Sequence, residues 1–166
     1  MAFKPCSRAA RLTAAIFFSL LLSGVMQGQS AGQVLTVTVP PQLSGARNSV
    51  LAAPISVQLR KGYHVNSNAP DDEYLIPLAL SWDAAPLELE QIIYPKASQA
   101  KFSFSEKMLS VYAGTFEILS RFRVPASAPA GQRVISGKLR YQACNDTMCL
   151  PPRTVEVRLP VEIRPN

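Results

Sequence analysis

Histidine is nearly absent from this 166-residue chain, which contains only His64. A Ser-His-Asp hydrolase needs a histidine matched to a serine and a carboxylate, and no such constellation is visible. The sequence also lacks a glycine-rich phosphate loop and a zinc-like set of four metal ligands. An isolated histidine of this kind is more often a surface or core residue than a ligand. These absences argue against hydrolase, nucleotide-binding and zinc chemistry.

Clustered basic residues are missing as well, although the formal net charge is +6. Three of the 17 Lys and Arg residues (Lys4, Arg8 and Arg11) lie at the N-terminus, where there is no acidic residue. Removing residues 1–30 leaves 14 basic and 11 acidic residues, a net charge of +3. The remaining basic residues are scattered along the chain, so no nucleic-acid-binding surface is predicted.

The N-terminus has the pattern of a secretory signal. An apolar run, residues 12–26, follows the three basic residues, and small residues follow the run. We expect residues 1–30 to be a cleavable signal peptide, with cleavage near Ser30–Ala31 or Gly32–Gln33 and export to a secreted or periplasmic compartment. An uncleaved membrane anchor is the alternative, but a bilayer span needs about 20 apolar residues. Cys6 precedes the run and would leave with the signal.

Helical periodicity is absent from residues 31–166, which we take as one domain. The segments instead alternate apolar and polar residues, as half-buried strands do, and turn signals separate them. Fourteen prolines suit such a loop-rich chain. The pattern predicts an all-β, immunoglobulin-like antiparallel β-sandwich. The expected strands are residues 35–39, 57–59, 74–82, 87–93, 109–113, 116–124, 135–143 and 155–161, with polar connections at 44–49, 67–73 and 96–106.

Two cysteines remain after the signal, Cys144 and Cys149. The turn formers Asn145 and Asp146 lie between them, and strand-like sequence approaches from both sides. This arrangement predicts a hairpin end with one cysteine on each arm. Opposed residues of an antiparallel pair have Cα atoms about 4.5–5.5 Å apart, which a disulfide accepts. An exported protein can keep such a bond.

The residues alone leave the role of this disulfide open. A bond that closes so short a loop would stabilise the fold by only about 2 kcal/mol in the chain-entropy model. The short span therefore favours a redox pair, while a static structural bridge stays possible. Cys144, Met148 and Cys149 are also soft ligands suited to Cu(I), although Met148 is more simply a hydrophobic contact.

Several motifs resemble the N-terminal periplasmic domain of the thiol:disulfide interchange protein DsbD. The most specific is Tyr141-Gln142-Ala143-Cys144 together with Cys149-Leu150-Pro151-Pro152. The other similar segments are Gly62-Tyr63-His64-Val65-Asn66-Ser67-Asn68, Asp72-Glu73-Tyr74-Leu75-Ile76-Pro77, and Val111-Tyr112 followed by Gly114 and Phe116. The resemblance covers about residues 33–163. The cysteine gap is one residue shorter than in the best-known form of the family.

The resemblance implies an immunoglobulin-like fold whose two cysteines cycle between dithiol and disulfide. By this resemblance Cys149 forms the mixed disulfides and Cys144 is its resolving partner. A cap loop with an aromatic residue, here Phe102 or Phe104, would cover the pair, and Tyr63 and His64 would line the cysteine end.

The resemblance also implies the partners and the activity. The domain would act as a monomeric component of a protein-disulfide reductase and would carry no cofactor. It would pass reducing equivalents from a membrane-embedded thiol reductase to periplasmic thioredoxin-like or disulfide isomerase proteins. Because the chain ends at Asn166, those partners are expected to be separate proteins. The alternative is a non-catalytic binding module with a structural disulfide.

Overall fold

The computed structural model describes Met1 and residues 33–165. The predicted signal peptide, residues 1–30, lies outside the described residues except for Met1. Within the described part the chain forms β-strands and no helix, so none of it forms a helix that could cross a membrane. The all-β prediction is confirmed.

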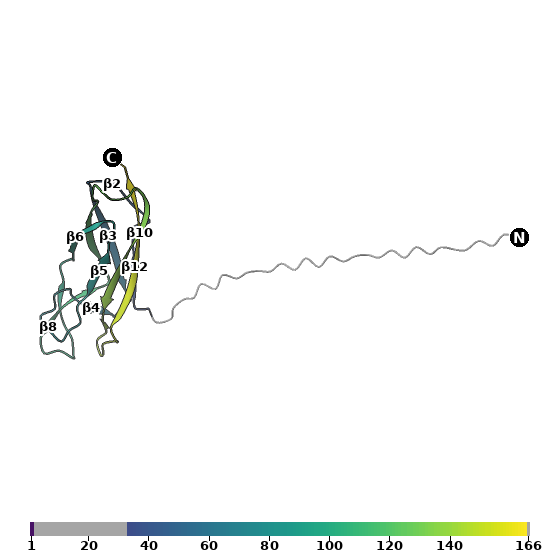
Figure 1. Ribbon diagram of the computed structural model, residues 1–166. Coiled ribbons are helices and arrows are strands. Elements are labelled where there is room, and N and C mark those ends of the chain that lie inside the picture. The colour runs from purple at the N-terminus through teal and green to yellow at the C-terminus, as the bar shows by residue number, and fades with distance from the viewer. Residues whose placement is uncertain (2–32, 166) are drawn as a thin grey trace. The chain divides into compact units, whose positions relative to one another are not determined.

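Two four-stranded sheets build the sandwich (Figure 1). The first has the order β1-β3-β9-β6, with antiparallel neighbours: β1 (Leu35–Thr38), β3 (Val50–Leu59), β9 (Thr115–Arg123) and β6 (Glu88–Ile93). The second has the order β2-β12-β10-β5: β2 (Leu43–Ala46), β12 (Arg153–Arg164), β10 (Gly131–Tyr141) and β5 (Ala79–Asp83). β2 pairs with β12 in parallel, and the other pairs of this sheet are antiparallel.

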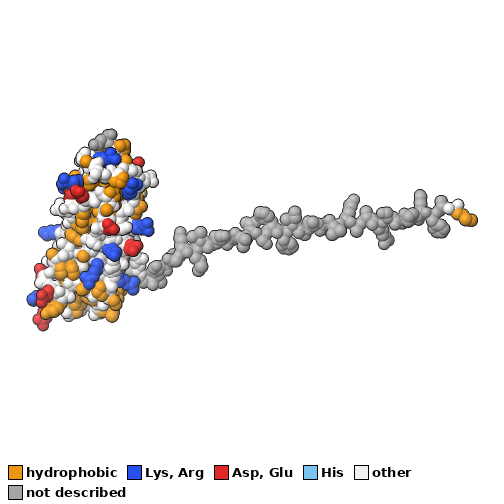
Figure 2. All heavy atoms as spheres, viewed as in Figure 1, with side chains coloured by type: hydrophobic (Ala, Val, Ile, Leu, Met, Phe, Trp, Pro, Cys, Tyr) orange, Lys and Arg blue, Asp and Glu red, His pale blue; other side chains and the backbone are white. Residues whose placement is uncertain are grey.

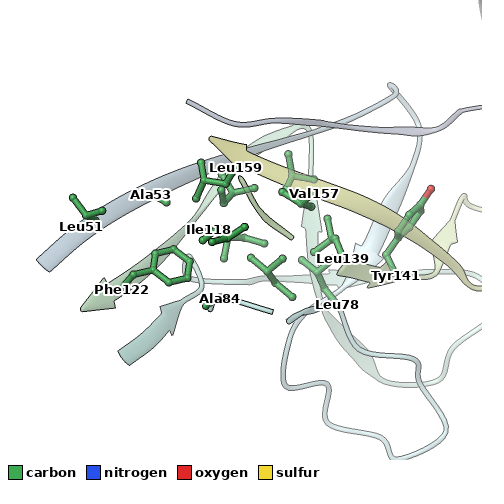
Figure 3. Packing of buried hydrophobic residues seen from close by; sticks show 14 of the residues in the cluster. Leu51, Ala53, Leu78, Ala84, Ile118, Phe122, Leu139, Tyr141, Val157 and Leu159 are labelled. Carbon is green, nitrogen blue, oxygen red and sulfur yellow. The ribbon is translucent and has the colours of Figure 1, made fainter. Parts of the chain in front are cut away.

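The core lies between these sheets and follows from the alternation in the sequence (Figure 3). Every second residue of the long strands is buried, and the side chains between them face solvent. Trp82 crosses the core, where its Nε1 donates a hydrogen bond to Ser120 Oγ at 3.0 Å. Gly137 opposes Trp82 in the register, and a Cβ there would come within 2.7 Å of the indole ring. The close approach therefore requires glycine.

A third, smaller sheet holds the cysteine end of the molecule. Its order is β11-β4-β8-β7, all antiparallel: β11 (Ala143–Cys144), β4 (His64–Asn66), β8 (Met108–Ala113) and β7 (Ser98–Lys101). Figure 1 shows β4 and β8 at the end of the sandwich away from the C-terminus. Only Gln142 separates β10 from β11, so the chain passes directly from the large sheet to the small one.

The predicted long strand over residues 74–82 is wrong in its first half. Only Ala79–Asp83 form a strand, and residues 67–78 form a loop. Backbone groups of this loop bond outside any strand ladder: the Ile76 carbonyl accepts from Asn66 Nδ2, and Leu75 N donates to the Asp72 carbonyl. Pro77 has no N–H to give to a sheet. Tyr74, placed in the strand by its alternation, is instead exposed.

Two predicted connections contain strands. Leu43–Ala46, at the start of the connection expected over 44–49, pairs with the end of β12. Ser98–Lys101, inside the connection expected over 96–106, forms the edge strand β7. Both strands have only four residues and little apolar surface to bury, so they lack the apolar alternation that predicts a strand.

Candidate functional site: a disulfide hairpin at the end of the sandwich

Cys144 and Cys149 form a disulfide between the two arms of a hairpin. Their Cα atoms lie 3.9 Å apart, closer than the antiparallel separation, since the bond draws the arms together. Leu150 N donates to the Ala143 carbonyl at 2.8 Å, and Asn145 N donates to the Met148 carbonyl at 2.9 Å. The predicted hairpin with one cysteine on each arm is confirmed.

The hairpin tip is held by one side chain. Asn145 Oδ1 accepts hydrogen bonds from the backbone N–H groups of Thr147 and Met148, at 3.0 and 2.9 Å, and from the Thr147 hydroxyl. Asparagine favours such turns because its side chain replaces a backbone acceptor. Beyond the tip, Pro151 and Pro152 lead into β12. The local sequence therefore fixes the loop that presents the sulfurs.

The two cysteines differ sharply in exposure. Cys144 is buried, with 1% of its surface accessible, whereas Cys149 is exposed. Met148, beside Cys149, is 57% exposed. An incoming thiolate must reach a sulfur along the S–S axis, so access decides which sulfur is attacked. Of the two cysteines, Cys149 is the residue exposed to an incoming partner.

His64 lies directly opposite Cys144. The two residues pair across β4 and β11, while the next pair, Val65 and Ala143, joins the hydrophobic core. Opposed residues of an antiparallel pair point to the same face of the sheet, and their neighbours point to the other. His64 and Cys144 therefore share the face away from the core. Ala143 and Cys144, which are neighbours in β11, therefore lie on opposite faces.

Three aromatic rings stack over that face. Phe102 lies on the His64 ring with centroids 3.9 Å apart and planes 16° apart. Phe104 stacks on Phe102 at 5.4 Å, and its ring is 6.4 Å from that of His64. Phe102 is half-buried, and Phe104 is 43% exposed. Of the two predicted cap residues, Phe102 is thus the inner one and Phe104 the outer one.

The segment with these phenylalanines is tied to the cysteine hairpin by Ser103. Its hydroxyl donates a hydrogen bond to the Asp146 carbonyl at 2.8 Å. The contact joins residues 43 positions apart in the sequence. Sequence reasoning missed Ser103, because a serine between two phenylalanines carries no signal for such a distant partner.

The electrostatic surroundings of His64 are dominated by burial. Removal from water lowers the pKa of His64 below its ordinary value, while the negative charge of Asp146 acts in the opposite direction. His64 is 5% exposed, and its Nε2 is buried with no hydrogen-bond partner among the residues that the structure describes. His64 is thus a buried residue, and within the described part of the chain its Nε2 is left unpaired.

Tyr63 lies apart from the other predicted site residues. It is half-buried against the hydrophobic core, and the Arg60 guanidinium lies over its ring, 4.7 Å from the centroid. Tyr63 precedes His64 by one position, so alternation turns it to the other side. The structure brings together Cys144, Cys149, His64, Phe102 and Phe104, and places Tyr63 outside this group.

No three His, Cys, Asp or Glu side chains approach one another closely enough to hold a metal ion, within the residues that the structure describes. Charged side chains are scattered over the face shown in Figure 2, and hydrophobic side chains reach its surface at the end where β4 and β8 lie. This end of the molecule carries the Cys144–Cys149 disulfide, the His64 imidazole and the rings of Phe102 and Phe104.

The fold and this site define the class of the protein: a β-sandwich domain that carries a disulfide hairpin at one end. The sequence matches the family described as "Thiol:disulfide interchange protein DsbD, N-terminal" over residues 35–160. The chain therefore belongs to the DsbD N-terminal domain family, as its cysteine motif indicated.

Solved structures with a similar fold include a periplasmic domain. The N-terminal periplasmic domain of ScsB from Proteus mirabilis superposes with a TM-score of 0.52 at 15% identity. The match covers 75% of this chain and 44% of that one, so this chain spans less than half of its length. A cohesin module from Clostridium perfringens follows at 9% identity and a TM-score of 0.45, covering 78% and 96% of the two chains. A search of curated proteins finds no match.

Proposed function

We propose that this domain relays reducing equivalents through the Cys144–Cys149 pair. It would accept them from a membrane-embedded thiol reductase or a thioredoxin-like module. It would then pass them to periplasmic thioredoxin-like or disulfide isomerase proteins, acting as a monomer. The predicted signal at residues 1–30 supports a periplasmic location, and ScsB contributes a periplasmic domain of similar fold.

The observation that carries the proposal is the unequal exposure of the two cysteines. A purely structural disulfide gains nothing from leaving one sulfur open at the end of a domain. An exchanging pair needs one reachable sulfur for the mixed disulfide and one protected sulfur that resolves it. The exposure of Cys149 and the burial of Cys144 support this division of roles.

The exchange balances as two successive displacements. A donor thiolate attacks Cys149 Sγ, and the electron pair of the broken Cys144–Cys149 bond leaves on Cys144 Sγ. A second donor thiolate attacks the donor's sulfur in the mixed disulfide and releases Cys149 as a thiolate. The donor is then oxidised to a disulfide, and the domain, after taking up two protons, holds two thiols. Delivery to an acceptor disulfide repeats the steps in reverse, with Cys149 attacking and Cys144 resolving.

The reduction potential of the pair tests this function. We would equilibrate the purified protein with glutathione buffers and count free thiols by alkylation. A value near or above about −250 mV is that of an exchanging pair. A value below about −300 mV is that of a structural bridge. That result would replace the relay with a binding module that keeps a static disulfide.

Single-cysteine variants test the assignment of the two sulfurs. With oxidised glutathione as the probe, Cys144→Ser should form a stable mixed disulfide through Cys149, visible by mass spectrometry. Cys149→Ser is the matched control, and it should react far more slowly because Cys144 is buried. Equal rates for the two variants would contradict the assignment.

A further inference from the structure

The unpartnered nitrogen of His64 is the feature that the exchange reaction, as described so far, does not use. Buried polar atoms in folded proteins are almost always hydrogen-bonded, so an exception calls for a reason. Nε2 of His64 is buried and, within the described residues 33–165, has no hydrogen-bond partner while the cysteines are joined. An unpaired buried donor costs free energy that a strong acceptor would recover.

The acceptor that appears during exchange lies directly across the strand pair. His64 opposes Cys144 on the face away from the core, and opposed Cβ atoms of such a pair are about 4.5–5.5 Å apart. When Cys149 is attacked, Cys144 Sγ loses its bond and can rotate about χ1. It then carries a full negative charge at a position that is 1% exposed.

We propose that His64 is a positioning residue for the exchange, and that its Nε2–H donates a hydrogen bond to the Cys144 thiolate. The inference rests on the proposed function, since it concerns the intermediate in which Cys149 holds the mixed disulfide. In that state the electron pair of the broken S–S bond resides on Cys144 Sγ. The imidazole stabilises this charge without losing its own proton.

The surroundings of the ring suit a neutral donor. Burial disfavours the imidazolium, as the lowered pKa of His64 indicates, so the ring at neutral pH carries one N–H. Phe102 stacks on the ring at 3.9 Å and limits its rotation. Asp146 on the cysteine hairpin is the charged group that acts on the ring. Its charge repels a thiolate, which makes a compensating donor more valuable.

The hydrogen bond would assist the reaction in both directions. A thiol with a lower pKa is a better leaving group when Cys149 is attacked. The same lower pKa gives a larger thiolate fraction when Cys144 resolves the mixed disulfide and closes the ring. His64 would thus stabilise the mixed-disulfide intermediate, both when it forms and when Cys144 resolves it. The imidazole itself takes no part in the covalent bonds that form and break.

The test is the titration of the Cys144 thiol in a Cys149→Ser background, followed by thiolate absorbance at 240 nm. His64→Phe keeps a ring for the stack with Phe102 and removes the N–H. We expect it to raise the pKa of the Cys144 thiol, so that the thiolate fraction at neutral pH falls about tenfold. His64→Gln keeps an N–H donor, so the pKa of its Cys144 thiol should lie between that of the parent protein and that of His64→Phe. Equal Cys144 titrations in the parent protein, His64→Phe and His64→Gln would overturn the proposal.

Tyr112→Phe is the matched control for a general disturbance of the small sheet. Tyr112 pairs with Val65 and donates its hydroxyl to Asn68 Oδ1, on the core side of β8. Losing that hydroxyl should leave the Cys144 titration unchanged. A shift as large as that of His64→Phe would assign the effect to the sheet and overturn the proposal.

The tautomer of His64, measured by NMR in the protein without any substitution of His64, gives a second test of the proposal. His64 is the only histidine, so its imidazole signals in a ¹⁵N–¹H spectrum need no assignment. The reduced protein should show the Nε2–H tautomer, with the Nε2 signals moving on reduction, whereas the Nδ1–H tautomer would overturn the proposal. The glutathione potential remains the separate test of the relay, because a structural bridge fails there whatever His64 does.

Discussion

The two halves of the molecule are held together in different ways. In the sandwich, β10 and β12 pair over eleven consecutive positions, and β3 and β9 over nine. At the cysteine end, β11 pairs with β4 over two positions, and β4 pairs with β8 over three. The disulfide, the Ser103 hydroxyl and a stack of rings add side-chain contacts to these short ladders. The scaffold is thus built from backbone pairing and burial, and the site from a few side-chain contacts.

This difference has a physical reason. A reactive sulfur must be reached by another protein, so the elements around it cannot be buried in long ladders. Regions that carry function are commonly those with few buried contacts, positioned by a more stable scaffold. The comparison predicts that equal changes in the two halves have unequal effects, which the following substitutions measure.

The largest effect is expected from truncating the core. Phe122 is fully buried between the sheets, so Phe122→Ala should lower the free energy of unfolding by about 3–5 kcal/mol. Phe102→Ala makes the same chemical change at the cysteine end, where the ring is half-buried, and should cost only about 1 kcal/mol. Urea denaturation measures both values. Equal losses would remove the distinction between scaffold and site.

Removing the disulfide should have an intermediate effect. The double variant Cys144→Ser/Cys149→Ser opens a loop of six residues, for which the chain-entropy model gives about 2 kcal/mol. The core strands should keep their protection in hydrogen exchange, because they do not depend on the bond. Loss of protection throughout β10 and β12 would show that the disulfide supports the scaffold itself.

A smaller effect is expected on the accessibility of Cys144. In a Cys149→Ser background, Phe102→Ala should speed alkylation of Cys144 several-fold, because Phe102 is the ring in contact with His64. Phe104→Ala should have less effect, since Phe104 contributes the outer layer of the stack. Alkylation rates with iodoacetamide compare the two. An unchanged rate in both variants would rule out a capping role for the stack.

The smallest effect is a pH dependence of stability that arises from His64. Its folded-state pKa lies below the unfolded value of about 6.5, so the unfolded chain binds the proton more readily. The contribution is therefore fully present above that pH and is lost as the pH falls through the acid range. His64→Gln should flatten this part of the profile. Parallel profiles for the two proteins between pH 7 and 5 would contradict the assignment.

The sequence predicted the scaffold better than its margins. β9, β10 and β12 are long, and over most of their length buried residues alternate with exposed or half-buried ones, because one face of each strand packs against the core. The prediction failed where burial did not follow the alternation. Residues 74–78 alternate but form a loop, and β2 and β7 pair without alternating. The periodicity of a sequence reports burial, and short edge strands have little of it.

In the candidate site, the features set by local sequence were predictable, and those set by contacts between distant segments were not. The hairpin and its disulfide were predictable, because Asn145 and the spacing of the cysteines act locally. The order of the stack, with Phe102 inside Phe104, depends on how a separate loop meets the hairpin. The facing of Tyr63 depends on where β4 begins. Neither is encoded within a short window of sequence.

The two prolines after Cys149 have a consequence for how another chain can meet this site. Pro151 and Pro152 carry no backbone N–H, so the segment that leads from the sulfur to β12 presents carbonyl acceptors alone. A neighbouring chain cannot extend a β-ladder along it, since strand addition needs donors and acceptors in alternation. Contact along these two residues is therefore confined to side chains and isolated carbonyls. Such contact is easily undone, as turnover requires of any protein that must release one partner before it meets the next.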